Sequence, residues 1–221
     1  MLPSERPRVL ITGACQGVGR ECAETFAARG AELILADNDA AALSELSRAL
    51  NAVGRYCDVA SEASVTVFAA DIIERFPELD MVINAAGGGY ERTLGMYRVS
   101  RAFMPALRKG TVHNILLNIP PADKDAGTAI FPYASSKQAF QRLCAALAAE
   151  TRGSSVRVLI GCPHSEHVSQ VLPDPNAGPW VDTCEISQTQ NDDDRGLAAH
   201  IASLFDPKDM DVMPFSRRNV A

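Results

Sequence analysis

The sequence predicts an α/β fold in which helices cover both faces of one doubly wound parallel sheet. Apolar runs of strand length alternate with amphipathic segments of helix length through most of the 221 residues, and the connections between them are short. Such alternation is typical of successive β–α units, whose strands pair in parallel and are buried on both faces. A chain of this length ordinarily forms one domain, so we expect residues 1–221 to fold as one.

Six β–α alternations occupy the chain as far as the sixth strand. The expected strands are residues 8–12, 32–36, a short run ending at residue 57, 81–84, 112–119 and 156–160. The expected helices extend to about residue 28 and then over 39–50, 61–75, 94–108 and 133–151. Ser61 is predicted to cap its helix, because a hydroxyl can accept a hydrogen bond from an unpaired N–H of the first turn.

The last third of the chain breaks this rhythm. Residues 163–193 contain four prolines, a glycine and the start of an acidic run, so we expect an irregular substrate-loop region with room for a short helix. The acidic residues 192–194 suit a solvated helix start, because carboxylates stabilise the positive end of the helix dipole. A final helix over 195–204 and a short strand over 210–215 would close the sheet.

Composition excludes several classes of protein. Twenty-one basic and 27 acidic residues give a net charge of −6, which argues against binding to nucleic acid or to an anionic membrane surface. No run of apolar residues is long enough for a membrane span, and the first residues do not form a signal peptide. The six cysteines include no CxxC pair, so we expect a reduced, cytoplasmic protein.

A glycine-rich segment, Thr-Gly-Ala-Cys-Gln-Gly-Val-Gly, lies between the first expected strand and the first expected helix. Glycines at this place let the backbone turn tightly and approach a pyrophosphate, while the helix start offers unpaired N–H groups and a positive dipole end. A tight β–α turn without a ligand is the alternative. The expected dinucleotide contacts from this segment are Gly13, Gln16, Gly17, Val18 and Gly19.

Two carboxylates end the next two strands on the same edge of the sheet. Asp37 ends the second strand, where it could accept hydrogen bonds from an adenosine ribose, and Asp58 follows the third, where it could meet the adenine amino group. Asp37 would repel a 2′-phosphate, its neighbour Asn38 is uncharged, and the turn supplies Gln16 rather than a cation. The sequence therefore favours NAD over NADP.

A tyrosine and a lysine share one face of the helix over 133–151. Tyr133 and Lys137 are four residues apart, so their side chains stack on that face. An ammonium near a phenol favours the phenolate, which lowers the pKa of tyrosine from its usual value of about 10. Such a phenol could exchange a proton with a substrate alcohol or carbonyl. A Tyr–Lys pair on a solvated helix is the alternative.

Taken together, these motifs resemble those of the short-chain dehydrogenase/reductase superfamily, in the family's order and over about three quarters of the chain. The matching residues are Thr12, Gly13, Gln16 to Gly19, Asp37, Cys57, Asp58, Val59, Asn84, Ala85, Ala86, Gly87, Tyr133 and Lys137. The resemblance implies a Rossmann-like domain and nicotinamide-dependent hydride transfer, with tyrosine as acid/base and lysine holding the nicotinamide ribose. It also implies further cofactor contacts from Val59, Asn84, Ala85, Ala86, Gly87, Tyr133, Lys137 and Pro163.

The chain departs from the family pattern around the expected substrate site. The family's serine at the end of the fifth strand is missing, since residues 118–123 read Asn-Ile-Pro-Pro-Ala-Asp. The family's asparagine falls near Arg92 or Thr93, the segment after Gly87 is short, and histidine replaces the glycine after Pro163. The chain is therefore expected to be an NAD-dependent oxidoreductase acting on a small alcohol or carbonyl. The alternative is an NAD-binding protein with little or no turnover, as a sensor or a non-catalytic subunit.

Other candidate groups carry less weight. His164 and His167 flank Glu166 without a third ligand nearby, so no metal site is expected. A thiol nucleophile at Cys15 or Cys162 is conceivable, but a structural cysteine is the more common case. Ser135, Ser136 or Thr128 could stand in for the missing serine.

The long helix over 133–151 also bears on assembly. After Lys137 it is apolar on nearly every side, so one face needs a partner, as in the family. We expect a homodimer or homotetramer built on the helices over 94–108 and 133–151.

Overall fold

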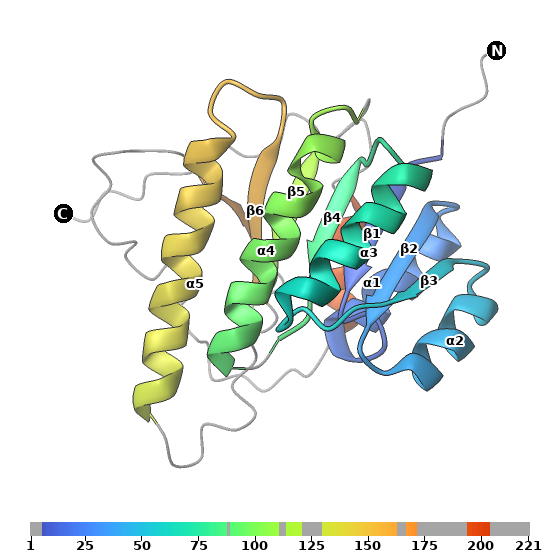
Figure 1. Cartoon of the computed structure of the whole chain (residues 1–221), viewed down its shortest axis with the longest axis horizontal. Helices are drawn as coiled ribbons and strands as arrows, with labels where there is room; N and C mark the ends of the chain where they lie inside the picture. The colour runs from blue at the N-terminus through green and yellow to red at the C-terminus, as the bar shows by residue number, and fades with distance from the viewer. Residues whose placement is uncertain are drawn as a thin grey trace.

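A computed structural model of the chain describes residues 6–87, 89–110, 114–120, 130–162, 167–171 and 194–203. Within these ranges seven strands form one sheet in the order β3-β2-β1-β4-β5-β6-β7, with helices on both faces (Figure 1). The predicted α/β class and the doubly wound parallel arrangement are confirmed. In the part that the structure describes, no helix is long and apolar enough to cross a membrane.

The elements have the following bounds. The strands are β1 Arg8–Thr12, β2 Glu32–Asp37, β3 Val53–Tyr56, β4 Met81–Asn84, β5 Ile115–Asn118, β6 Arg157–Cys162 and β7 His167–Gln170. The helices are α1 Gly17–Ala28, α2 Ala40–Ala49, α3 Glu62–Arg75, α4 Gly89–Leu107, α5 Ile130–Glu150 and α6 Asp194–Ser203.

The central strands divide their apolar side chains between two cores. Leu10 and Val82 pack with α3, α4 and α5 on one face of the sheet, the face toward the viewer in Figure 1. Val9, Ile11 and Met81, their neighbours in the chain, pack with α1, α2 and α6 on the other face. Successive side chains of a strand point to opposite faces, so a continuous apolar strand needs helices on both.

Side-chain caps fix where two helices begin. Ser61 Oγ accepts a hydrogen bond from Ser64 N at 3.3 Å, as predicted for the start of α3. Asp39 caps α2 by accepting from the backbone N–H groups of Ala41 and Ala42. Asp39 lies two residues after the end of β2 and Ser61 lies five residues after the end of β3, so both helices start at the edge of the sheet where these strands finish.

The structure differs from the sequence prediction at several places. Residues 167–170, expected to be irregular, form β7, which pairs antiparallel with β6. Helix α4 begins at Gly89 rather than near residue 94, because the three successive glycines 87–89 conceal its start from a periodicity argument. Strand β5 begins at Ile115, and residues 112 and 113 of the expected strand lie outside the described residues. The strand expected over 210–215, and residues 163–166 and 172–193, lie outside the described residues.

Candidate functional site

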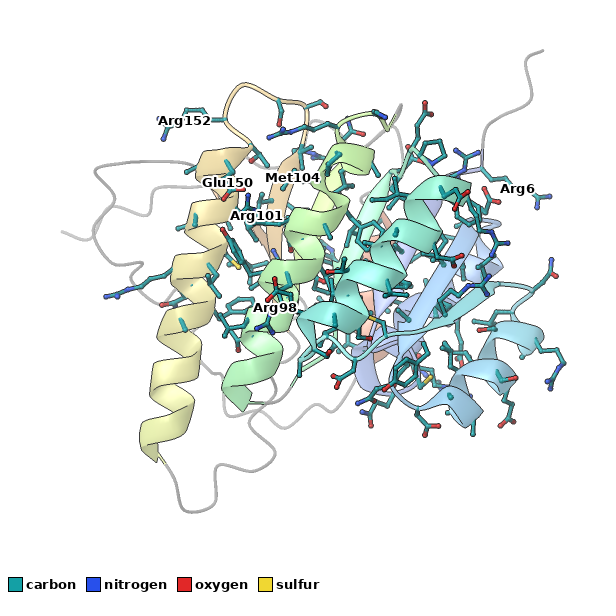
Figure 2. All side chains as sticks on the ribbon, in the orientation of Figure 1. Arg6, Arg98, Arg101, Met104, Glu150 and Arg152 are labelled. Atoms are coloured by element: carbon teal, nitrogen blue, oxygen red, sulfur yellow. The ribbon has the colours of Figure 1, made fainter. Side chains whose placement is uncertain are left out.

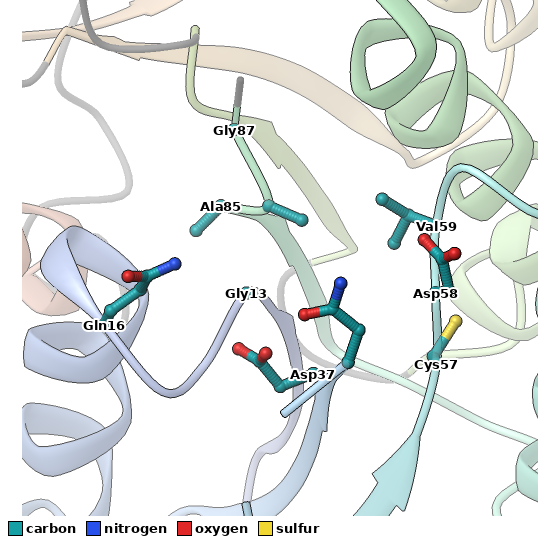
Figure 3. Close-up of a pocket in the computed structure, with 10 residues that line it drawn as sticks. Gly13, Gln16, Asp37, Cys57, Asp58, Val59, Ala85 and Gly87 are labelled. Carbon is teal, nitrogen blue, oxygen red and sulfur yellow. The ribbon is translucent and has the colours of Figure 1, made fainter. Parts of the chain in front are cut away.

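A pocket lies at the carboxyl ends of the first four strands (Figure 3). In the doubly wound sheet, β1 is flanked by β2 on one side and by β4 on the other, and such switch points are where α/β sheets bind ligands. The residues that line the pocket are Gly13, Gln16, Asp37, Asn38, Cys57, Asp58, Val59, Ala85, Ala86 and Gly87.

The glycine-rich turn supplies one wall of this pocket. Gly13 has φ +67° and Gly17 has φ +53°, a backbone region that favours glycine. A Cβ on Gly13 would lie 2.6 Å from the backbone N and Cα of Ala86, and one on Gly19 would overlap the carbonyl oxygen of Gly13. The backbone of the turn and the backbone at the end of β4 are therefore in direct contact, with no side chain between them.

The start of α1 faces the same turn. Gln16 is the N-cap residue, and its side chain makes no capping hydrogen bond to the first turn. Unpaired N–H groups at a helix start attract anions, because they carry the positive end of the helix dipole. This part of the turn can hold a phosphate.

Asp37 is fixed in the pocket by backbone donors. One carboxylate oxygen accepts from Cys15 N at 2.9 Å, and the other accepts from Asp39 N at 3.1 Å. Asp37 is only 7% exposed, and its carbonyl oxygen accepts from Cys57 N at 3.0 Å. A carboxylate oxygen has two lone pairs, so each oxygen can accept one bond more. Asp37 is thus suited to accept hydrogen bonds from vicinal hydroxyls.

Asp58 holds a second carboxylate at the pocket rim. Its Oδ1 accepts from Ala60 N at 3.0 Å, and its own N–H donates to Ser64 Oγ at 3.0 Å. In Figure 3, Asp58 and Val59 lie on the side of the pocket opposite Gln16. Among the described residues, the pocket lining includes two carboxylates and no lysine, arginine or histidine, so these residues disfavour a further anionic group on this side.

The two thiols near the pocket are poor nucleophiles. Burial, followed by the negative charge of Asp37, raises the pKa of Cys15 to about 12. Burial raises the pKa of Cys57 to about 11. Both thiols are therefore protonated near neutral pH, where a nucleophilic cysteine would need to be a thiolate. A role for Cys15 as a nucleophile loses its support.

Asn84 does not line the pocket. Its Nδ2 donates to Ser100 Oγ at 3.0 Å and to Asn118 Oδ1 at 2.9 Å, and its side chain is buried. Asn84 therefore joins β4, β5 and α4 beneath the pocket, on the side of the sheet that α4 covers. Its assignment to the cofactor rested on the motif alone, which does not say to which face the side chain turns.

The structure brings most of the predicted binding residues together. Among the predicted residues, the pocket lining contains Gly13, Gln16, Asp37, Asn38, Asp58, Val59, Ala85, Ala86 and Gly87. Gly17, Val18 and Gly19 form the first turn of α1 instead. Cys57 lines the pocket without having been assigned to it. Cys57 directly precedes Asp58 at the end of a strand, and this position in the sequence could have indicated that it lines the pocket.

The expected catalytic side is less fully described. Tyr133 and Lys137 both belong to α5, one helical turn apart, but their side chains and Pro163 lie outside the described residues. The same holds for the side chain of Arg92 and for Pro121. Thr93 is buried in α4. No group of three metal-ligating side chains occurs within the described ranges.

These features together are those of a dinucleotide-binding α/β protein: the sheet topology, the glycine turn and the carboxylate of Asp37 held at the pocket wall. Residues 7–169 match the family model described as short chain dehydrogenase, and the chain belongs to this family of oxidoreductases. Family membership implies a nicotinamide cofactor. The pocket fits the adenosine side of such a group, because Gly13 presents bare backbone at its wall and Asp37 offers acceptors there.

Individual relatives share about three tenths of the sequence. The chain is 30% identical to the L-fucose dehydrogenase of Oryctolagus cuniculus over 196 residues, which are 76% of this chain and 68% of the relative. It is 28% identical to dehydrogenase/reductase SDR family member 7B of Mus musculus, over 73% of this chain and 58% of the relative. The chain thus spans less than two thirds of the length of the second relative.

Among solved structures, one neighbour is the alcohol dehydrogenase of the archaeon Thermococcus sibiricus complexed with 5-hydroxy-NADP. It superimposes with a TM-score of 0.58 at 26% identity, over 71% of this chain and 75% of that chain. The likeness supports a nicotinamide cofactor for this fold and leaves the choice between NAD and NADP to the residues of the pocket.

The close approach at Gly13 yields a testable prediction. Gly13→Ala should lower the free energy of unfolding by clearly more than Gly30→Ala and should abolish dinucleotide binding. Both glycines have positive φ, so either alanine costs about 1–2 kcal/mol in backbone strain. A Cβ at Gly30 would meet nothing within 4 Å, whereas one at Gly13 would overlap Ala86.

Urea denaturation measures both variants, and titration with NADH measures binding. Equal destabilisation by the two substitutions would contradict the overlap at Ala86.

Proposed function

We propose that the chain is an NAD-dependent oxidoreductase acting on a small alcohol or carbonyl substrate. The observation that carries the proposal is the carboxylate of Asp37, held by the N–H groups of Cys15 and Asp39 at the wall of a pocket formed by the glycine turn. Gly13, Gln16 and the start of α1 would hold the pyrophosphate, Asp37 the adenosine ribose and Asp58 the adenine amino group.

Charge supports NAD rather than NADP. A 2′-phosphate would lie next to Asp37, where the lining offers the uncharged Asn38 and Gln16 instead of a lysine or arginine. A phosphate brought beside a carboxylate of low exposure is repelled, and none of the described lining residues is a cation that could offset this repulsion. Arg20, in the first turn of α1, forms an ion pair with Glu24 at 2.9 Å, so its charge is already paired.

Tyr133 and Lys137 would supply the proton chemistry. NAD, when bound, supplies the hydride acceptor of the reaction. The phenolate of Tyr133 would take the proton of a substrate alcohol and become the hydroxyl, and in the reverse direction this hydroxyl would give its proton to the carbonyl oxygen. The ammonium of Lys137, one turn along α5, would favour the phenolate and orient the nicotinamide ribose. The position of the family's serine offers no hydroxyl to assist them.

A second candidate function is NAD binding with little or no turnover, in a sensor or a non-catalytic subunit. The absence of any hydroxyl residue from positions 118–123 favours it, as does the absence of asparagine at positions 92 and 93. Removing one preorganised donor from a developing oxyanion costs about 3–4 kcal/mol, or roughly a hundred- to a thousandfold in rate. A protein that lacks both groups can keep the pocket and lose efficient catalysis.

The cofactor preference can be measured directly. Fluorescence titration should show NADH binding at least about tenfold more tightly than NADPH, because a tenfold ratio needs only about 1.4 kcal/mol of repulsion. Asp37→Asn, which removes the charge, should narrow this ratio. Asp39→Asn is the matched control, since it removes a neighbouring charge that does not line the pocket and keeps a good helix cap. Equal or tighter binding of NADPH by the wild type would refute NAD preference.

The role of Tyr133 separates the two candidate functions. Any alcohol or carbonyl turnover should be slow, and Tyr133→Phe should abolish it while leaving NADH affinity nearly unchanged, because the phenol acts mainly in proton transfer. Activity in the wild type that disappears in the variant supports the enzyme, and no turnover across a substrate panel despite tight NADH binding supports the second candidate. Full activity in Tyr133→Phe would show that another group is the acid/base.

We further propose a homodimer or homotetramer built on α4 and α5. Helix α5 buries Phe140, Cys144 and Leu147 within the chain, so these do not need a partner. Its outer surface carries the exposed small residues Ala145, Ala146 and Ala149, across which a second helix can pack closely. Light scattering at micromolar concentration should give twice or four times the 23.7 kDa chain mass, and a monomer would rule the assembly out.

A further inference from the structure

We propose that Arg98 of α4 is a positioning residue for the adenine end of the pocket, acting through the backbone that carries Asp58. The inference rests on the proposed function, because it needs an adenine dinucleotide in the pocket. It concerns a residue that does not line the pocket and that no motif singled out.

Arg98 contacts the segment between β3 and α3. Its Nη1 donates a hydrogen bond to the carbonyl oxygen of Ala60 at 3.0 Å, from a half-buried position 38 residues further along the chain. Ala60 directly follows Asp58 and Val59, both of which line the pocket. A guanidinium bonded to a carbonyl oxygen is a stronger restraint than a bond between neutral groups.

The backbone of α4 packs against the same segment one turn earlier. A Cβ on Gly95 would lie 2.5 Å from the carbonyl oxygen of Val59, so the helix approaches this peptide at backbone distance. Two positions of α4, three residues apart on one face, thus contact the carbonyls of two successive residues. The segment is held from the helix side by contact at Val59 and by a hydrogen bond at Ala60.

This restraint reaches the carboxylate of Asp58 through Ala60, whose carbonyl oxygen and N–H belong to two successive peptide units. Ala60 N donates to Asp58 Oδ1 at 3.0 Å, and Ser61 N donates to the carbonyl oxygen of Asp58 at 3.0 Å. Fixing Ala60 from one side therefore fixes the side chain of Asp58 from the other. Loss of the Arg98 bond would let the turn from Asp58 to Ser61 shift and would change where the carboxylate lies.

The placement of Asp58 can be read from the base that the pocket prefers. A carboxylate accepts a hydrogen bond from the amino group of adenine but repels the carbonyl oxygen that hypoxanthine carries at the same position. Wild-type protein should therefore bind NADH more tightly than nicotinamide hypoxanthine dinucleotide in its reduced form. The ratio of the two affinities reports on Asp58 and is unaffected by the fraction of protein that is folded.

The experiment compares Arg98→Met with Arg101→Met, and Figure 2 shows both arginines on α4. Arg101 is the matched control, because it is exposed and pairs with Glu150 at 3.7 Å instead of the β3–α3 segment. Arg98→Met should reduce the adenine-to-hypoxanthine affinity ratio by about tenfold, the size expected for one hydrogen bond to a charged group. Arg98→Lys, which retains a donor cation, should restore part of the ratio, and Arg101→Met should leave it unchanged.

The affinity ratios of the variants and of the wild type test the positioning role and the proposed function separately. An unchanged ratio in Arg98→Met, whatever happens to its melting temperature, overturns the positioning role and leaves Arg98 as a structural contact. The same fall in Arg101→Met would also overturn it, since the effect would then follow from any loss of charge on α4. If wild-type protein binds neither dinucleotide, the proposed function itself fails, and this outcome is distinct from the first two.

Discussion

The site depends on the close approach of two backbones, the turn after β1 and the end of β4. Gly13 lies so near Ala86 that no side chain fits between them, and a Cβ on Gly19 would likewise overlap the carbonyl oxygen of Gly13. The parallel pairing of β1 with β4 brings Thr12 opposite Asn84, so both strands end at the same level. This backbone contact forms part of the pocket wall next to the start of α1. The other pocket residues lie around it.

Around this contact, backbone donors restrain acidic side chains. Asp37 accepts from two N–H groups, one of them from the glycine turn itself, and Asp58 accepts from the N–H of Ala60, the residue whose carbonyl oxygen Arg98 binds. A carboxylate held in this way loses little conformational freedom when a ligand binds, which favours affinity. Its charge would also repel an anionic group placed beside it. In the proposed function, the same few hydrogen bonds would contribute to cofactor affinity, to the choice of NAD over NADP and to the choice of base.

The face of the sheet under α4 has a different chemistry. Asn84, Asn118 and Ser100 form a hydrogen-bonded group buried between β4, β5 and α4, beside the apolar core that Phe68 and Phe103 build with an edge-to-face contact. Polar groups in such a place cost free energy unless they are bonded, and bonded they favour one alignment of the strands and the helix. Since α4 also contacts Val59 and Ala60, the position of this helix affects the segment that carries Asp58, which lies at the proposed adenine end of the pocket.

The sequence by itself determined the order of strands and helices, the cap at Ser61, the glycine turn and the carboxylates at the ends of β2 and β3. These features follow from periodicity and from residue types at fixed offsets, which act over a few residues. Only the tertiary structure decided that residues 167–170 pair with β6. It also decided that the side chain of Asn84 bonds to Ser100 and Asn118 rather than lining the pocket, and that Arg98 bonds to the carbonyl oxygen of Ala60. Such contacts join residues far apart in the chain, and they depend on how helices and strands pack, which no local pattern encodes.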